Sequence, residues 1–244
     1  MIKKQNYLKH AIVLFLLLLL MQPERAWAAY ENVEFSSLTN HDGLTNSQVG
    51  AILKDTRGYI WFGTQSGLCR FDGFRMKTFY YINTDDKSLP NNSVDELQQD
   101  YGGNIWVHTS VGYCIYKYDE EQFERKPEEW LKNIHVQGPP YKLLIDKDKN
   151  MWIAVYGQGL YYHNAKTKNT YLFKFTKKAQ PGCLKEGNIS KITEVDGDAL
   201  ITYGDGTICR VNGQKQKALW YNSFLATHKV AGDNGAYTFY DGIG

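Results

Sequence analysis

From residue 44 onward, short runs of alternating apolar and polar residues are separated by turns that contain glycine. The run 49–54 ends at Asp55, an aromatic and β-branched run follows at 59–64, and another apolar run begins after Gly67. Period-two alternation over such lengths indicates half-buried β-strands, because successive side chains of a strand point to opposite faces. Helical apolar spacing is absent and glycine interrupts the runs too often for helices, so we expect an all-β fold.

The strand pattern repeats along the chain. Residues 44–71 and 89–116 align without a gap at an offset of 45 and are identical at ten positions. Weaker copies follow, the last near the end of the chain. A period of about 45 residues with four short antiparallel strands is typical of a β-propeller blade. The repeats are expected near 44–82, 89–124, 136–175, 187–222 and 229–244.

These copies predict an incomplete β-propeller with about four four-stranded antiparallel blades and the start of a fifth. Residues 33–44 resemble the outer strand and linker that precede the second repeat, with Phe35 in the place of Phe79. In a closed propeller such an N-terminal strand completes the last blade and removes an exposed edge. The fifth copy stops within a repeat, so we expect this chain to be the beginning of a longer protein.

An aspartate, a tryptophan and a glycine recur in the first three repeats and are interpreted as structural. In the D-x-x-G turn the aspartate is expected to accept backbone hydrogen bonds and the glycine to adopt a positive φ. A large ring at one position of every blade favours a place between blades over a sugar-stacking platform. The structural set is Asp55, Trp61, Gly67, Asp100, Trp106, Gly112, Asp146, Trp152 and Gly159.

Residues 55–73 read D-x-x-G-x-I-W-F-G-T-x-x-G-L-x-R-F-D-G, and the lead-in GLTNSQVGAIL occupies residues 43–53. This motif resembles the two-component regulator propeller repeat. The resemblance covers residues 30–244 and weakens by the fourth repeat. It departs from the pattern at His108, where the first repeat has glycine, and at Leu200, which replaces tryptophan.

The resemblance implies a seven-bladed ring outside the inner membrane, as part of a hybrid two-component sensor. It implies that the parent protein continues into a sensor histidine kinase and a phosphorelay, which this chain lacks, and that the full-length parent is a homodimer. The implied signal is an oligosaccharide from polysaccharide breakdown. We therefore expect a ligand-sensing segment without enzyme activity of its own, whose partners are the ligand and the remaining blades and kinase domains.

The N-terminus predicts export. Lysines at positions 3, 4 and 9, an apolar run at 11–21 and the A-W-A sequence at 26–28 are typical of a signal peptide, here residues 1–28. An uncleaved anchor is the alternative. Residues 29–244 are then periplasmic, with the parent in the inner membrane. Residues 1–28 carry a net charge of +3, so the +2 of the whole chain becomes −1 for residues 29–244, and we expect no nucleic-acid contact.

Cysteine and histidine positions predict no metal site and no cofactor. Cys69, Cys114 and Cys209 each follow a loop glycine, which indicates one repeated buried position. A disulfide that involves Cys183 is the alternative. No nucleophile elbow, phosphate loop or spaced ligand pair occurs, so no catalytic residue is assigned.

Ligand binding is expected where the repeats differ and their loops converge. Strand polarity places the loop after the second strand of every repeat on one face, together with the linkers between repeats. Amide, hydroxyl and aromatic side chains there suit a neutral sugar, although plain solvent-exposed loops are the alternative. The candidate ligand-binding residues are Gln65, His108, Ser110, Tyr156, Gln158 and Asp205.

Two other functions remain open from sequence. One is a propeller carbohydrate-active enzyme, a glycoside hydrolase or lyase, because paired carboxylates cannot be recognised from spacing alone. The other is a non-catalytic propeller that binds proteins.

Overall fold

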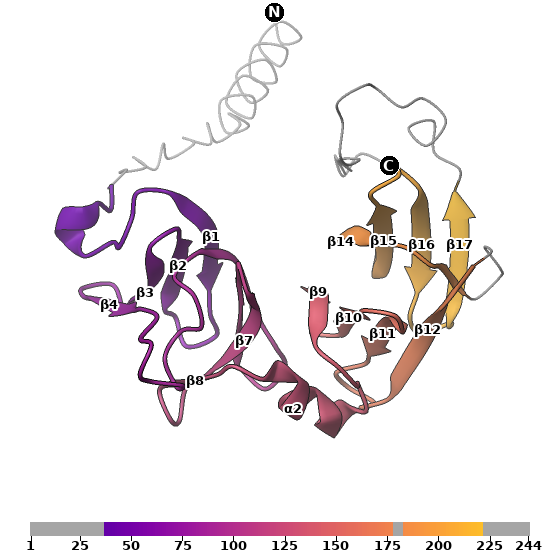
Figure 1. Cartoon of the computed structure of the whole chain (residues 1–244), viewed down its shortest axis with the longest axis horizontal. Coiled ribbons are helices and arrows are strands. Elements are labelled where there is room, and N and C mark those ends of the chain that lie inside the picture. Colours follow the sequence, from indigo (N-terminus) through magenta and orange to yellow (C-terminus); the bar gives the residue numbers. More distant parts are fainter. Residues whose placement is uncertain (1–36, 178–182, 222–244) are drawn as a thin grey trace, which may run out of the picture. The chain divides into compact units, whose positions relative to one another are not determined.

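The structure is a computed structural model that describes residues 37–177 and 183–221 (Figure 1). The expected signal peptide, the strand around Phe35 and the fifth repeat at 229–244 lie outside the described residues. Within the described ranges, no helix has the length and apolar character needed to cross a membrane.

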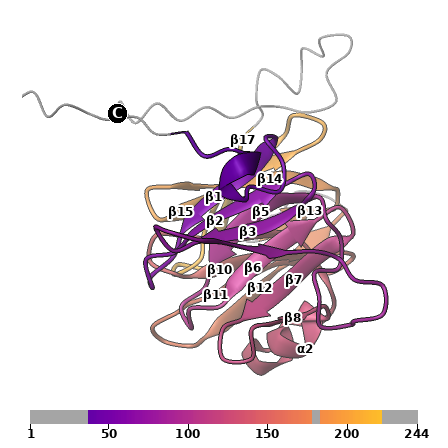
Figure 2. The same cartoon turned by 90° about the vertical axis from the view of Figure 1, so that its left-hand side faces the viewer.

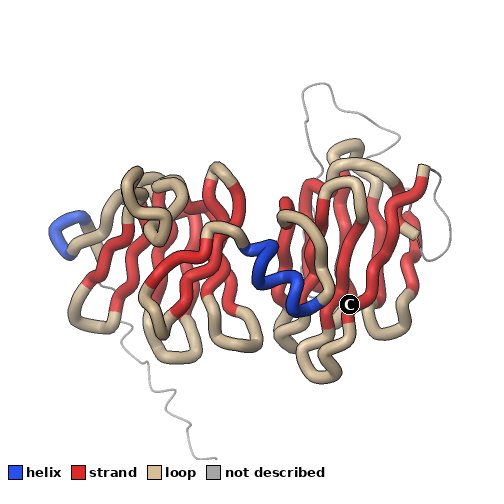
Figure 3. Tube along the Cα trace, turned by 60° about the horizontal axis from the view of Figure 1, so that its bottom comes forward, coloured by secondary structure: helices blue, strands red, loops and turns tan. Residues whose placement is uncertain are grey.

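Four antiparallel sheets follow one another along the chain, and Figure 3 shows how strands dominate the described residues. Blade 1 has the strand order β1 (Val49–Lys54), β2 (Ile60–Thr64), β3 (Gly67–Phe71) and β4 (Met76–Phe79). Blade 2 has the order β5 (Val94–Gln99), β6 (Ile105–Thr109), β7 (Gly112–Lys117) and β8 (Gln122–Glu124). Blade 3 contains β9 (Pro140–Ile145), β10 (Met151–Val155), β11 (Gly159–His163) and β12 (Thr170–Thr176). Blade 4 contains β14 (Ile189–Val195), β15 (Asp198–Tyr203), β16 (Ile208–Asn212) and β17 (Lys217–Tyr221). The predicted all-β architecture is confirmed, with four antiparallel strands in each blade and one added strand in blade 3.

Three short elements depart from the repeat. A 3-10 helix, η1 (Asn40–Asp42), lies in the N-terminal linker. Helix α2 (Pro127–Leu131) and the 3-10 helix η2 (Lys132–Ile134) connect blades 2 and 3. Strand β13 (Leu184–Lys185) pairs in parallel with the outer strand β12, so blade 3 has a fifth strand.

The first strand of each blade is its innermost strand. β1 contacts β5, β5 contacts β9 and β9 contacts β14, so successive blades are neighbours through these strands. Figure 2 views the molecule from the side of blade 1, with β1, β2 and β3 toward the viewer. Each blade begins with a strand of the same direction. The loops after second strands and the linkers between blades therefore share one side of the propeller, here called the linker side. The D-x-x-G turns and the turns between third and fourth strands share the other, here called the turn side.

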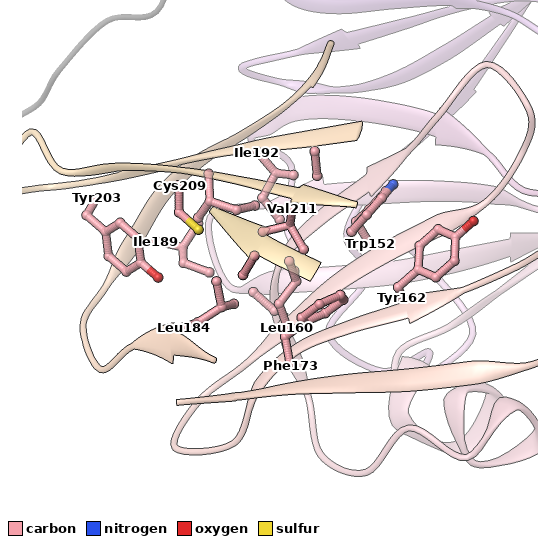
Figure 4. Packing of buried hydrophobic residues seen from close by; sticks show 14 residues of the cluster. Trp152, Leu160, Tyr162, Phe173, Leu184, Ile189, Ile192, Tyr203, Cys209 and Val211 are labelled. Carbon is pink, nitrogen blue, oxygen red and sulfur yellow. The ribbon is translucent and has the colours of Figure 1, made fainter. Parts of the chain in front are cut away.

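The main cores lie between blades. Trp61 of blade 1 belongs to a buried cluster with residues of blade 2, Trp106 to one with blade 3, and Trp152 to one with blade 4. All three rings are at most 1% exposed. Figure 4 shows the blade 3–blade 4 cluster, which includes Trp152, Leu160, Tyr162, Phe173, Ile189, Ile192, Cys209 and Val211.

Blade 1 exposes a surface that the other blades bury. The side chain of Ile52 is 66% exposed, whereas the residues at the same position of blades 2, 3 and 4 are 8%, 3% and 9% exposed. Those residues are Leu97, Leu143 and Ile192. Leu97 of blade 2 packs in the cluster that contains Trp61 of blade 1. A residue at the Ile52 position therefore packs on the side of the preceding blade that carries its tryptophan.

All four cysteines are thiols in this structure, and none forms a disulfide. Cys69, Cys114 and Cys209 are buried on their blades, at the repeated position that their spacing predicts. Burial raises the pKa of the Cys114 thiol well above its ordinary value, so this thiol stays protonated.

Candidate functional site

The candidate ligand residues lie on the linker side. Gln65, Ser110, Tyr156 and Asp205 stand in or beside the loops that follow the second strand of each blade, and His108 lies at the end of β6. Gln158 is the last residue of this loop in blade 3. The topology thus brings all six to one side of the propeller, on four different blades.

A β-bulge recurs at the linker-side end of every innermost strand. In blade 1, Val49 pairs with Thr64 and Ala51 with Gly63, so Gly50 is left without a cross-strand partner. A bulge re-aims the side chain of the extra residue. The equivalent extra residues in blades 2 to 4 are Asp95, Tyr141 and Ser190. Sequence reasoning missed these positions, because each bulge lies one residue from the end of its strand, where too little alternation remains to reveal an extra residue.

In blade 2 the bulge residue Asp95 binds His108. Nδ1 of His108 lies 2.6 Å from Oδ1 of Asp95, and the imidazole packs on the ring of Tyr113 with centroids 4.4 Å apart. Tyr113 in turn donates to Glu96 at 2.8 Å and accepts from the backbone N–H of Leu143 in blade 3 at 3.1 Å. The cluster therefore fixes His108 at the junction of blades 2 and 3.

In blade 1, Gly63 stands where blade 2 has His108. A Cβ on Gly63 would lie 2.6 Å from Cγ1 of Val94 and 3.2 Å from its carbonyl oxygen, so a side chain there would require β5 to shift. Blade 2 has room for an imidazole at this position, which is why His108 can replace the glycine of the repeat motif there.

In blade 3 the bulge residue Tyr141 supports Tyr156. Their rings stack with centroids 4.1 Å apart and planes inclined by 21°. Tyr156 is 68% exposed. One face of its ring therefore packs on Tyr141, and the other face is exposed to solvent. Such a ring can stack on the apolar face of a ligand with little further loss of side-chain freedom.

The remaining candidate residues form hydrogen bonds within the protein. The amide oxygen of Gln65 accepts from the hydroxyl of Ser93 at 2.9 Å, and the backbone N–H of Ser110 donates to the carbonyl of Ser93 at 3.2 Å. Gln158 donates to the carbonyl of Gln137 at 2.8 Å. These contacts tie the linker-side loops to the neighbouring linkers.

Asp205 forms an ion pair with Lys185. Partial burial raises the pKa of Asp205, but hydrogen bonds from Lys185 and Thr207 outweigh that effect and bring it to about 2. Asp205 is therefore an anion at neutral pH whose charge is already matched.

The structural residues of the repeat lie on the turn side and at strand starts. Asp55, Asp100 and Asp146 are 5%, 2% and 4% exposed. The glycines that begin β3, β7 and β11 have positive φ values of 132°, 120° and 145°. A Cβ at Gly159 would lie 2.0 Å from the carbonyl oxygen of Phe173, so no other residue fits there.

Within residues 37–177 and 183–221, no three His, Cys, Asp or Glu side chains gather closely enough to hold a metal ion. The linker side instead offers an exposed ring, an imidazole bound to a carboxylate, and backbone-anchored polar loops. These groups suit noncovalent recognition.

Comparison with family models finds a match within blade 1. Residues 43–66, which span β1, the D-x-x-G turn and β2, match the family model described as two component regulator propeller. The match covers one repeat of this chain. This repeat is the one in which the sequence motif is most complete. A comparison with curated proteins finds no match.

A solved structure shares the fold of this chain. The extracellular domain of the protein described as hybrid two component system BT3049 of B. thetaiotaomicron is 22% identical, with a TM-score of 0.54. The match covers 76% of this chain and 26% of that one. The extracellular domain of BT4673 from the same organism is 15% identical, with a TM-score of 0.43 and coverage of 73% and 30%. The chain thus spans about a quarter of the first structure, and the likeness shows a shared propeller fold.

Proposed function

We propose that this chain is part of the extracytoplasmic propeller of a two-component sensor and that it recognises an oligosaccharide. The observation that carries the proposal is the match of residues 43–66 to the two-component regulator propeller model. The propeller fold shared with an extracellular domain of a hybrid two-component system and the signal-like residues 1–28 support it. The kinase that would report binding belongs to the parent protein.

The linker side is the proposed recognition surface. The exposed ring of Tyr156 on Tyr141 provides a stacking platform, and the imidazole of His108 lies at the neighbouring blade junction. An oligosaccharide presents apolar C–H faces to such a ring and hydroxyl groups to polar side chains. Recognition here needs neither a metal ion nor covalent chemistry.

Binding is tested with the full chain on an array of oligosaccharides from plant and microbial polysaccharides. Tyr156→Ala is expected to weaken binding of the recognised sugar at least about tenfold, which is roughly 1.4 kcal/mol. Tyr80→Ala removes a different exposed tyrosine, 46% exposed in the linker after β4, and is expected to leave binding unchanged. Equal effects of the two substitutions would exclude Tyr156 as the platform.

The sensor role is tested in cells of the source organism. A transcriptional reporter is measured with the recognised sugar, in strains that carry wild-type or Tyr156→Ala protein at normal abundance. The proposal expects induction only in the wild type. Turnover of the sugar by the purified protein, or a reporter that ignores it in both strains, would contradict the sensor role.

A further inference from the structure

A cleft lies on the turn side, between blades 3 and 4 and away from the proposed recognition surface. Its walls are the turn between β11 and β12 and the turn between β16 and β17, and its volume is about 450 Å³. This volume lies in the range of sites for small organic ligands. Its main polar lining residues are Tyr162, Asn164, Asn169, Tyr171, Gln214 and Gln216.

Close backbone packing shapes the cleft. Tyr162 and Tyr171 are cross-strand partners in blade 3, and both belong to the core that faces blade 4. The turn of blade 4 approaches them at Gly213, where a Cβ would lie 2.4 Å from the ring of Tyr162. Only glycine allows this contact, so the turn rests directly on the buried tyrosine.

Some polar groups of the lining serve the fold. The side-chain oxygen of Asn164 accepts from the backbone N–H groups of Lys166 and Thr167, at 3.0 and 2.8 Å. Its amide nitrogen donates to the hydroxyl of Tyr162 at 3.1 Å. Asn164 therefore holds the turn, and its side-chain oxygen is already used by two backbone donors.

Other polar groups of the lining are open. Among the described residues, the hydroxyl of Tyr171 and the side-chain amides of Asn169 and Gln216 form no hydrogen bond. Tyr171 is half-buried, with its ring against Phe173 at a centroid distance of 4.8 Å. An anchored ring beside two unused amides can pair with a ligand that carries several hydroxyl groups.

The lining carries a single charge. Lys166, exposed at the tip of the β11–β12 turn, is the one charged residue among the described lining residues, which include no Asp or Glu. Lys166 forms no ion pair within the described part of the chain. The ammonium group of Lys166 can pair with a ligand that bears one carboxylate.

We propose that this cleft binds one or two sugar units of which one is a uronic acid. The sugar ring stacks on Tyr171, its hydroxyl groups pair with Asn169 and Gln216, and its carboxylate pairs with Lys166. The proposal does not depend on the sensor role, because it concerns other blade loops on the opposite side of the propeller.

The test uses the full chain and matched disaccharide pairs, digalacturonate with galactobiose and cellobiouronic acid with cellobiose, titrated by calorimetry and by ligand-observed NMR. At least one acidic member is expected to bind saturably. Lys166→Gln should weaken its binding about tenfold and leave the neutral partner unaffected, because a charge-assisted bond is lost. Lys191→Gln, at an exposed lysine of β14, is the matched control.

A second pair of variants tests the ring and the amides. Tyr171→Phe keeps the packed ring and removes the hydroxyl, and Tyr80→Phe is its control. Gln216→Ala removes an exposed amide, with Gln122→Ala as control. Each cleft variant should weaken binding with an unchanged melting temperature, whereas Tyr156→Ala on the linker side should not affect it. The proposal is wrong if no disaccharide binds saturably, or if the cleft variants bind as the controls do.

Discussion

Trp61 donates a hydrogen bond from its indole nitrogen to the carboxylate of Asp55, with Nε1 and Oδ2 2.6 Å apart. The other carboxylate oxygen accepts from the backbone N–H groups of Arg57 and Tyr59, at 2.9 and 3.0 Å. One side chain thus closes the D-x-x-G turn and orients the tryptophan that fills the space before the next blade. Blades 2 and 3 repeat the aspartate–indole bond at 3.0 and 3.3 Å.

Asp100→Asn in blade 2 is expected to lower the free energy of unfolding by about 1–3 kcal/mol, because it leaves buried donors without an acceptor. The carboxylate accepts from two backbone N–H groups, from the amide of Asn104 and from the indole of Trp106. An amide would place a donor against some of these donors. Urea unfolding measures the loss. Asp119→Asn is the control, since that side chain is 99% exposed, and should cost less than about 0.5 kcal/mol.

Leu97→Ala and Ile52→Ala should differ in cost although they change the same repeat position. Leu97 is buried between blades 1 and 2, so its truncation should cost about 2–5 kcal/mol. Ile52 is mostly exposed, and its truncation should cost less than about 1 kcal/mol. The comparison is made by urea unfolding of the full chain. Equal costs would show that another surface covers Ile52 in solution.

His163 is expected to make the protein less stable as the pH falls below 6.5. Thr170 donates to the carbonyl of Ile134 at 2.6 Å, so its oxygen accepts from Nδ1 of His163, which lies 2.9 Å away. The other ring nitrogen, Nε2, is buried without a hydrogen-bond partner. Burial lowers the pKa of His163 below its ordinary 6.5, and the nearby charges of Lys168 and His135 lower it further.

The direction of this pH dependence follows from proton binding to His163 in the folded and unfolded states. Between pH 6.5 and the lower pKa of the folded state, the unfolded chain binds a proton at His163 and the native protein does not. Stability is therefore complete above pH 6.5 and declines as the pH falls through this window. Urea unfolding at pH 8, 7, 6 and 5.5 measures the decline. His163→Asn keeps a donor toward Thr170 and should flatten the profile; an unchanged slope would assign the decline to other groups.

The repeat spacing predicted the strands well because each strand boundary coincides with a local signal. The run 49–54 is β1, and the turn glycines fall where strands begin. Interblade burial of the tryptophans also follows from recurrence, since an equivalent position in every blade meets an equivalent neighbour. The helix α2 between blades 2 and 3 breaks the repeat and has no counterpart among the described residues of the other linkers, so periodicity did not predict it.

The candidate site was predicted only in part. Strand polarity placed Tyr156 and His108 on the linker side, but their partners Tyr141 and Asp95 are bulge residues that a period-two pattern does not reveal. The turn-side cleft was missed because its two walls come from blades 3 and 4. Their approach depends on Gly213, whose contact with a distant ring leaves no signal in a single sequence.

Tyr156→Ala and Gln158→Ala should separate recognition from stability on the linker side. In the structure Gln158 donates to the carbonyl of Gln137, and its oxygen accepts from the hydroxyl of Tyr161. Gln158→Ala should therefore cost about 1–2 kcal/mol in unfolding free energy, because two hydrogen bonds that hold the loop are lost.

Tyr156 has no such role in its loop. Its contact is the stack on Tyr141, which contributes about 0.5–1.5 kcal/mol at most when the ring is largely exposed. Tyr156→Ala should thus lower the melting temperature less than Gln158→Ala does, while it abolishes more of the oligosaccharide binding. Thermal unfolding and glycan titration of both variants measure the two effects. If Tyr156→Ala is the more destabilising change, the ring supports the fold and the loss of binding cannot be assigned to stacking on the ligand.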